Sequence, residues 1–316
     1  MSAELGIGLA AVARPAYITA GREADLGEHR SVEDLRARTW EVLDTAVAAG
    51  IGYVDVARSY GRAEEFLAAW LRARPDAHVE VGSKWGYRYV GGWRLDADTH
   101  EVKDHSMAAF LAQREETVAL LGGRLSVYHV HSATLGTGVL DDAPLHRAMA
   151  GLRERGVAVG VSTSGPDQAA AVRRALEVSV DGVPLFTSVQ STWNVLETSA
   201  APALAEAAAA GVRVLVKEPL ANGRLAPDDV DGSPGATRFA EVARSLELGP
   251  DTLAVAAAMA QPWAGLVLSG AVTAQQVRSN AAATGLELPD DVLAGLLGLA
   301  EVPEDYWAAR SRRSWG

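Results

Sequence analysis

Short runs of apolar residues alternate along the chain with longer stretches of helical periodicity. Apolar runs of about four to eight residues indicate buried strands, and apolar positions recurring every three or four residues indicate amphipathic helices. Eight strands are predicted, at residues 5–10, 53–56, 79–84, 125–131, 158–162, 187–190, 212–217 and 265–269. The helices predicted between and after them cover residues 32–49, 63–74, 106–121, 145–155, 167–177, 201–210, 237–260 and 274–283.

Local signals support several of these boundaries. Ser31 and Asp34 have the spacing of a capping box at the start of the first helix. The Gly-Pro pair at 249–250 is expected to break the seventh helix, and residues 289–300 predict an added helix after the last strand. Glycine, which favours the left-handed conformation found after helix ends, follows three predicted helices, at Gly50, Gly156 and Gly211.

Eight strands that alternate with helices favour a (β/α)8 barrel, in which parallel strands close into a cylinder surrounded by helices. The 316 residues fit one such barrel as a single domain over residues 1–316. An open, doubly wound sheet is the alternative. The turn Gly6-Ile7-Gly8-Leu9-Ala10-Ala11 lacks the third glycine of the dinucleotide-binding fingerprint of that fold, which favours the barrel.

Composition and charge narrow the classes of function. The chain has 29 basic and 40 acidic residues, a net charge of −11, and no cysteine. Because an acidic surface repels phosphate backbones and anionic lipids, nucleic-acid and membrane partners are not expected. Without cysteine there is no disulfide, thiolate nucleophile or cysteine-ligated metal. The N-terminal residues lack the pattern of a signal peptide, and the apolar run at 253–260 is too short to span a bilayer, so a cytoplasmic protein is expected.

The carboxyl ends of the strands are where a (β/α)8 barrel carries its active site. Four polar side chains fall at or just after the predicted ends of strands two to four: Asp55, Tyr60, Lys84 and His131. A phenol has a pKa of about 10, and it becomes a better acid when a neighbouring ammonium stabilises its anion. A carboxylate can hold that ammonium in place, and an imidazole can orient a substrate oxygen. The pattern therefore predicts proton donation by Tyr60.

Each of these residues, taken alone, also fits a structural role. Asp55 fits a helix cap, Tyr60 a half-buried packing residue, and His131 a structural histidine with satisfied hydrogen bonds. Lys84 fits a purely structural role less well, because a buried lysine needs a partner. His129 lies two positions before His131 on one strand and is expected to face the barrel interior.

At these residues the chain resembles the aldo-keto reductase family. The stretch Gly52-Tyr-Val-Asp55-Val-Ala-Arg-Ser-Tyr60-Gly61-Arg-Ala-Glu64 resembles the family signature, and Ser83-Lys84 resembles its lysine strand. Later motifs follow in the family's order: Leu125-Ser-Val-Tyr128-His-Val-His131, Gly156-Val-Ala-Val-Gly160-Val-Ser162, Gln190-Ser-Thr-Trp193-Asn194, Glu218-Pro219-Leu220-Ala-Asn-Gly223-Arg-Leu225, and Ser269-Gly270-Ala271 through Gln276 to Asn280. Each motif is weak alone, and the ordered set is specific.

The resemblance implies a (β/α)8 barrel that binds a nicotinamide cofactor across its rim and reduces an aldehyde or ketone by reversible hydride transfer. It implies that Tyr60 is the general acid, that Lys84 and Asp55 tune it, and that His131 positions the carbonyl. It further implies three groups of cofactor-binding residues. Those at the nicotinamide are Ser162, Thr163, Gln190 and, stacking on the ring, Trp193; those at the pyrophosphate are Pro219, Leu220, Asn222, Gly223 and Arg224; those at the adenosine end are Ser269, Gly270, Ala271, Thr273, Gln276 and Asn280.

The residues at the adenosine end leave open whether the cofactor is NADP(H) or NAD(H). The resemblance favours NADP(H), whose 2′-phosphate many members bind with a lysine and an arginine. Gly270 and Gln276 stand at those positions here, so NAD(H) is the alternative. Free amides at the N-terminus of the last barrel helix and Arg278 can still bind a phosphate.

The substrate is expected to be a small carbonyl compound or alcohol. Residues 85–105 form a long connection before the next predicted helix, and loops of that length are uncommon unless functional. Trp85, Tyr87 and Trp93 in this connection are expected to line the substrate pocket. Residues Arg14, Pro15 and Tyr17, after the first strand, are expected on its opposite wall.

Two other functions are weighed against a reductase. A non-catalytic cofactor-binding sensor on the same fold is disfavoured because all four candidate catalytic residues are present. A metal-dependent barrel hydrolase is suggested by the His129-x-His131 spacing. No other histidine lies at a predicted strand end, and residues 265–270 contain no acid to complete such a site, so no metal site is expected.

Overall fold

Eight parallel strands form a closed barrel in the computed structural model, which describes residues 3–19, 22–27, 29–227 and 232–315. Neighbouring strands follow the order β1-β12-β11-β10-β7-β6-β3-β2, and β2 pairs again with β1. The prediction of a (β/α)8 barrel is confirmed. The barrel strands are β1 (Glu4–Gly8), β2 (Tyr53–Asp55), β3 (Glu80–Trp85), β6 (Leu125–Ala133), β7 (Ala158–Thr163), β10 (Ser188–Thr192), β11 (Arg213–Lys217) and β12 (Leu266–Ser269).

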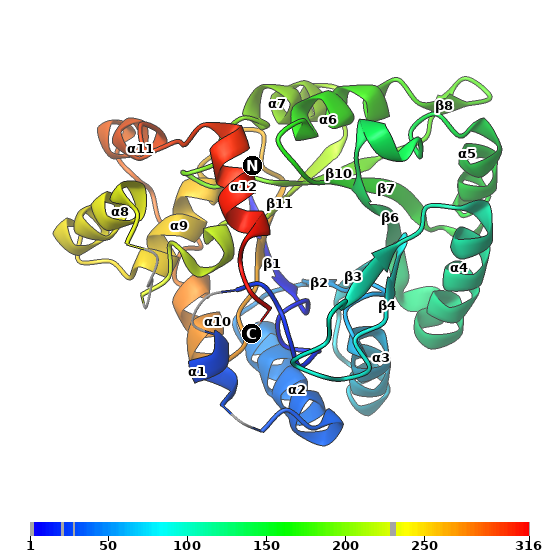
Figure 1. The fold of residues 1–316 in the computed structure, drawn as a ribbon, viewed down its shortest axis with the longest axis horizontal. Coiled ribbons are helices and arrows are strands. Elements are labelled where there is room, and N and C mark those ends of the chain that lie inside the picture. Colours follow the sequence, from blue (N-terminus) through cyan, green and yellow to red (C-terminus); the bar gives the residue numbers. More distant parts are fainter. Residues whose placement is uncertain (1–2, 20–21, 28, 228–231, 316) are drawn as a thin grey trace.

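Helices surround the barrel on the outside, as Figure 1 shows in a view with the strands near the centre. Most of them connect one barrel strand to the next. They are α1 (Arg22–Leu26), α2 (Val32–Ala48), α3 (Ala63–Ala73), α4 (Met107–Leu121), α5 (Ala143–Ala150), α6 (Gln168–Leu176), α7 (Ala201–Ala209), α8 (Pro234–Ser245), α9 (Pro250–Met259), α10 (Ala274–Ala281), α11 (Asp290–Leu297) and α12 (Pro303–Ser311).

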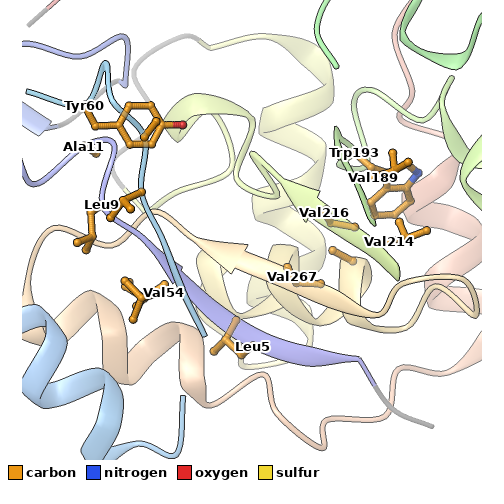
Figure 2. Packing of buried hydrophobic residues seen from close by; sticks show 14 of the residues in the cluster. Leu5, Leu9, Ala11, Val54, Tyr60, Val189, Trp193, Val214, Val216 and Val267 are labelled. Atoms are coloured by element: carbon orange, nitrogen blue, oxygen red, sulfur yellow. The ribbon is translucent and has the colours of Figure 1, made fainter. Parts of the chain in front are cut away.

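Alternate residues of each barrel strand face the interior and the helices. Outward side chains such as Val189, Val214 and Val267 pack in the large core between strands and helices, where Figure 2 shows them. The interior is filled by a smaller apolar cluster, and His129 lies inside with its Nε2 3.0 Å from the Ser188 hydroxyl. That cluster consists of Tyr53, Val127, Leu215, Leu266 and Leu268.

Several local predictions are confirmed. Ser31 and Asp34 form a reciprocal capping box at the start of α2, and the helical region between β11 and β12 divides into α8 and α9 at Gly249 and Pro250. The predicted tail helix corresponds to α11. Left-handed backbone occurs at the three glycines after helix ends, Gly50, Gly156 and Gly211, with φ of 81°, 72° and 79°.

Other elements have no counterpart in the predicted set. The connection after β3 contains a hairpin of β4 (Tyr87–Tyr89) and β5 (Glu101–Lys103), and a second hairpin joins β8 (Ser179–Val180) to β9 (Val183–Pro184). Helices α1 and α12 also lie outside the predicted boundaries. These segments are short or irregular, so they carry too few periodic positions to be recognised.

The loop after β2 is fixed against the loop after β1 by Gly61. This glycine has φ of 58°, and a Cβ there would lie 2.8 Å from the Ala13 carbonyl oxygen. A residue with a side chain would therefore be strained by its backbone and by the contact. The close approach fixes the position of Tyr60 at the carboxyl end of the barrel.

Candidate active site

One large cleft opens at the carboxyl ends of the strands, with a volume of about 960 Å³. Its lining extends from Tyr60 and His131 past β10 and β11 to α10 and α2. All four candidate catalytic residues surround one end of it, which we call the reaction end: Asp55, Tyr60, Lys84 and His131. Three of them line the cleft, and Lys84 lies directly behind Tyr60.

Asp55 and Lys84 form a buried ion pair beneath the cleft. The Lys84 ammonium donates to Asp55 Oδ2 and, at 3.1 Å, to the carbonyl oxygen of Val56. The other carboxylate oxygen of Asp55 accepts from Gln190 Nε2 at 2.9 Å. The side chain of Lys84 has no exposed surface and that of Asp55 is 4% exposed. A lysine so buried is stable only with such a partner, and the pair holds the ammonium in one place.

Tyr60 lies over this pair and against His131. Lys84 Nζ is 4.9 Å from the centroid of the Tyr60 ring, and the Tyr60 and His131 rings meet edge to face with centroids 5.5 Å apart. Tyr87 contacts the other side of His131 at 4.9 Å. Nδ1 of His131 is buried without a hydrogen-bond partner. The phenol and the imidazole thus line one end of the cleft, and the ammonium lies directly behind the phenol, as the sequence predicts.

The protonation states at this end follow from burial. Burial, and then the charge of Asp55, raise the pKa of Tyr60 well above its usual value. This direction is opposite to the acidification expected from Lys84, because burial disfavours the charged phenolate and the Asp55 carboxylate adds to that effect. Burial, and then Lys84, lower the pKa of His131 well below its usual value. At neutral pH Tyr60 is therefore a protonated donor and His131 a neutral imidazole.

Eleven of the fifteen residues expected to bind the cofactor line the cleft. Gln190 lies nearest the reaction end, and its amide oxygen is not used in the bond to Asp55. The other ten are Pro219, Leu220, Asn222, Gly223, Ser269, Gly270, Ala271, Thr273, Gln276 and Asn280. They come from two segments of the chain, residues 219–223 and 269–280.

Trp193 is wrongly predicted to stack in the cleft. Its ring is fully buried and packs against Trp263 with centroids 5.7 Å apart. Figure 2 shows it beside Val189 and Val214, well away from Tyr60. Strand β10 continues to Thr192, so the strand alternation carries the next side chain outward to the helices.

Three other cofactor residues also make internal contacts instead of facing the cleft. Ser162 is buried, and its hydroxyl accepts from the Ser132 amide at 2.8 Å. The Thr163 hydroxyl lies 2.6 Å from that of Ser191, behind the sheet. Arg224 is buried in an ion pair with Glu301. These three side chains therefore do not line the cleft, where contacts to the carboxamide or pyrophosphate are expected.

The substrate wall is only partly as predicted. Tyr87 lines the cleft, as do Arg14 and Tyr17 on the opposite side. Trp85 is buried behind the wall, against Phe110 at 5.0 Å. Trp93 packs outside the cleft, and its ring NH donates to the carbonyl oxygen of Arg30 at 2.9 Å.

Two further groups of cleft residues were not predicted. Trp315, after α12, reaches the cleft and contacts Tyr17 at 6.1 Å between ring centroids. Lys217 and Glu218, at the end of β11, line the floor together with Arg310 from α12. Lysine is rare in this chain and Lys217 ends a predicted strand, a signal that could have identified it. No comparable pattern marks the residues of α12.

At the other end of the cleft, α1 meets α10. Gln276 Nε2 donates to Asp25 Oδ2 at 2.7 Å, and Gln276 Oε1 accepts from the Val272 amide at 2.9 Å. Asp25, Gln276 and Arg278 line the cleft here, and we call these three residues the far end. Both polar atoms of the Gln276 side chain therefore form hydrogen bonds within the protein. The Asp25 carboxylate lies beside the position expected for a 2′-phosphate.

Within the described ranges, no three histidine or acidic side chains are close enough to hold a metal ion. His129 lies inside the barrel and bonds to Ser188. Of the described helices, none combines the length and apolar character needed to cross a membrane.

The fold and the cleft define a (β/α)8 barrel with a tyrosine, a lysine, an aspartate and a histidine at one rim. A model of the aldo/keto reductase family matches residues 24–301. The chain therefore belongs to the aldo/keto reductase family, a family of oxidoreductases.

Individual relatives are distant. Protein tas of Escherichia coli (strain K12) is 26% identical, covering 87% of this chain and 92% of that protein. D-threo-aldose 1-dehydrogenase of Pseudomonas sp is also 26% identical, covering 84% and 88%. Among solved structures, the holo form of aldo-keto reductase AKR11C1 from Bacillus halodurans has a TM-score of 0.71 at 20% identity, covering 95% and 93%. Glycerol dehydrogenase AKR11B4 from Gluconobacter oxydans has a TM-score of 0.68 at 19% identity, covering 93% and 90%.

Proposed function

We propose that this protein is an NAD(P)H-dependent reductase of aldehydes or ketones, with Tyr60 as the proton donor to the carbonyl oxygen. The observation that carries the proposal is the buried Lys84–Asp55 pair directly behind a protonated tyrosine in the cleft. A structural ion pair has no need of a cleft-lining phenol above it. Proton donation to a forming alkoxide does need that arrangement.

The residues present fit a nicotinamide cofactor. The cleft is large enough for a dinucleotide and runs from the reaction end to the N-terminus of α10, where Thr273 caps the helix. Near the reaction end, the Gln190 amide oxygen would accept a hydrogen bond from the carboxamide of the cofactor. When bound, the cofactor supplies the hydride. Pro219, Leu220, Asn222 and Gly223 would hold its pyrophosphate portion.

The side chains of the reaction end have separate roles in this proposal. His131 is neutral, so it donates a hydrogen bond to the substrate carbonyl oxygen and orients it without competing as an acid. Tyr60 then releases its proton to that oxygen, and the Lys84 ammonium stabilises the phenolate. Asp55 holds the ammonium in position. In the reverse direction the same groups remove a proton from an alcohol.

The experiment that tests this function is a panel of carbonyl compounds assayed for oxidation of NADPH and of NADH. The panel includes aliphatic and aromatic aldehydes and ketones. Aldoses and glycerol, assayed with the oxidised cofactors, are added because relatives are named for them. We expect turnover of at least one class. A protein that binds cofactor but fails to oxidise it in a single turnover with any aldehyde would instead be a non-catalytic sensor.

A further inference from the structure

Lys217 is a half-buried lysine in the cleft that the proposed chemistry does not use. It is the last residue of β11, and its side chain is 16% exposed. The ammonium donates to the Thr192 hydroxyl at 2.7 Å. Its ion-pair contact, with Glu218, is 3.8 Å and so beyond hydrogen-bond distance.

The carboxylate that could neutralise Lys217 is already engaged. Both oxygens of Glu218 accept from the guanidinium of Arg310, and one also accepts from Thr192. Glu218 holds a left-handed backbone, with φ of 58°, so its position is tightly determined. Arg310 and Lys217 lower the pKa of Glu218 to about 2 despite its burial. Two cations thus share one carboxylate, leaving about one positive charge.

The wider surroundings do not remove this charge. Burial lowers the pKa of Lys217 to about 8; Glu218 opposes that shift, and Arg310 and Lys84 add to it. Asp55 also raises the Lys217 pKa, but this carboxylate is bonded to Lys84. At neutral pH, Lys217 is therefore mostly protonated.

This charge lies next to the proposed nicotinamide position. Thr192 and Lys217 are paired residues of β10 and β11, and Gln190 is two residues before Thr192 on the same face of β10. Gln190 and Lys217 both line the cleft. A ring whose carboxamide binds Gln190, and whose reacting face meets Tyr60 and His131, must pass close to Lys217.

We propose that Lys217 determines the relative affinity for the two redox forms of the cofactor, by disfavouring the oxidised one. The oxidised nicotinamide ring carries a positive charge and the reduced ring is neutral, so the ammonium repels only the oxidised form. This inference rests on the proposed function. It predicts an enzyme that retains the reduced cofactor and releases the oxidised one, which suits carbonyl reduction. Lys217 is thus a specificity-determining residue, distinct from the proton donor.

The size of the effect follows from Coulomb's law. Two unit charges about 6–10 Å apart, at an effective dielectric constant of about 20, change an equilibrium constant by about tenfold to a hundredfold. A tenfold change in the ratio of the two dissociation constants equals about 30 mV in the reduction potential of the bound cofactor.

The test is calorimetric titration of NADP⁺, NADPH, NAD⁺ and NADH into wild-type protein and into Lys217→Met. We expect the ratio of oxidised to reduced dissociation constants to fall at least tenfold in the variant, mainly through tighter binding of the oxidised forms. Lys217→Gln also removes the charge and should give the same ratio. This second variant keeps the test valid if Lys217→Met does not fold.

The matched control is Lys103→Met. Lys103 Nζ donates to the Ser132 carbonyl oxygen at 2.9 Å, on the hairpin side of the barrel. The same loss of charge there should change the ratio less than twofold. An unchanged ratio in both Lys217 variants, with cofactor still bound, would overturn this inference alone. Failure of wild-type protein to bind any of the four cofactors would overturn the proposed function and the inference together.

Discussion

The two ends of the cleft are built differently. At the reaction end, the Lys84 and Asp55 side chains are 0% and 4% exposed, and each charged group has a specified partner. At the far end, Arg278 is exposed and Asp25 and Gln276 are only half-buried. Acid and base chemistry requires fixed, desolvated groups, whereas recognition of a flexible adenosine needs only surface contacts. The reaction end is therefore expected to be sensitive to single substitutions and the far end tolerant of them.

The largest effect is expected for Tyr60→Phe at the reaction end. General acid catalysis contributes about 10²–10⁴-fold in rate, so kcat should fall by that factor while cofactor dissociation constants change less than twofold. Steady-state kinetics and calorimetry measure the two. Tyr87→Phe, which removes another phenol lining the same cleft, should cost less than tenfold. Retention of most of kcat by Tyr60→Phe would transfer the role of donor to His131.

The second-largest effect is expected on the free energy of unfolding. Lys84→Met leaves Asp55 buried with only the Gln190 amide, and breaking a buried pair in this way costs about 3–5 kcal/mol. Urea unfolding should show this loss, and the double variant Lys84→Met/Asp55→Asn should regain much of it. Arg94→Met, in a pair whose side chains are 66% and 77% exposed, should leave the free energy of unfolding almost unchanged. Equal losses for the two pairs would show that burial does not distinguish them.

The smallest effect is expected at the far end. Asp25→Asn removes a negative charge beside the position proposed for the 2′-phosphate, so NADPH should bind about five- to tenfold more tightly. NADH affinity and the free energy of unfolding should stay almost unchanged. Titration of both cofactors measures the difference, and Asp76→Asn, in the exposed turn before β3, is the control. An equal gain for both cofactors would mean that Asp25 does not face the 2′ position.

Where strand periodicity and a local motif coincide, the sequence is sufficient. Asp55 is the last residue of β2, and Lys84 is the last but one of β3. Because these two strands are neighbours in the barrel, the topology alone brings the two side chains together. Tyr60 follows within the same motif, and Gly61 fixes its loop by a contact that few other residues tolerate. His131 lies beside these residues because it is carried by β6, which pairs with β3.

Small shifts in strand length explain why Trp193 and Trp85 do not face the cleft. The predicted strand ends at Gln190, but β10 runs to Thr192, and alternation then points Trp193 away from the cleft. Trp85, at the last position of β3, likewise points away from the cleft. Because side chains change faces at every residue, an error of one or two residues at a strand end decides whether a ring faces ligand or helix.

The sequence by itself determined the barrel, its strand order and the four residues of the reaction end, because each depends on short-range periodicity and on the fixed closure of parallel strands. Only the tertiary structure decided which side chains meet around Lys217 and at the far end. Glu218 meets Arg310 across 92 residues, and Asp25 meets Gln276 across 251. Such pairings depend on how a terminal helix and a short early helix pack on the finished barrel, and no local pattern records them.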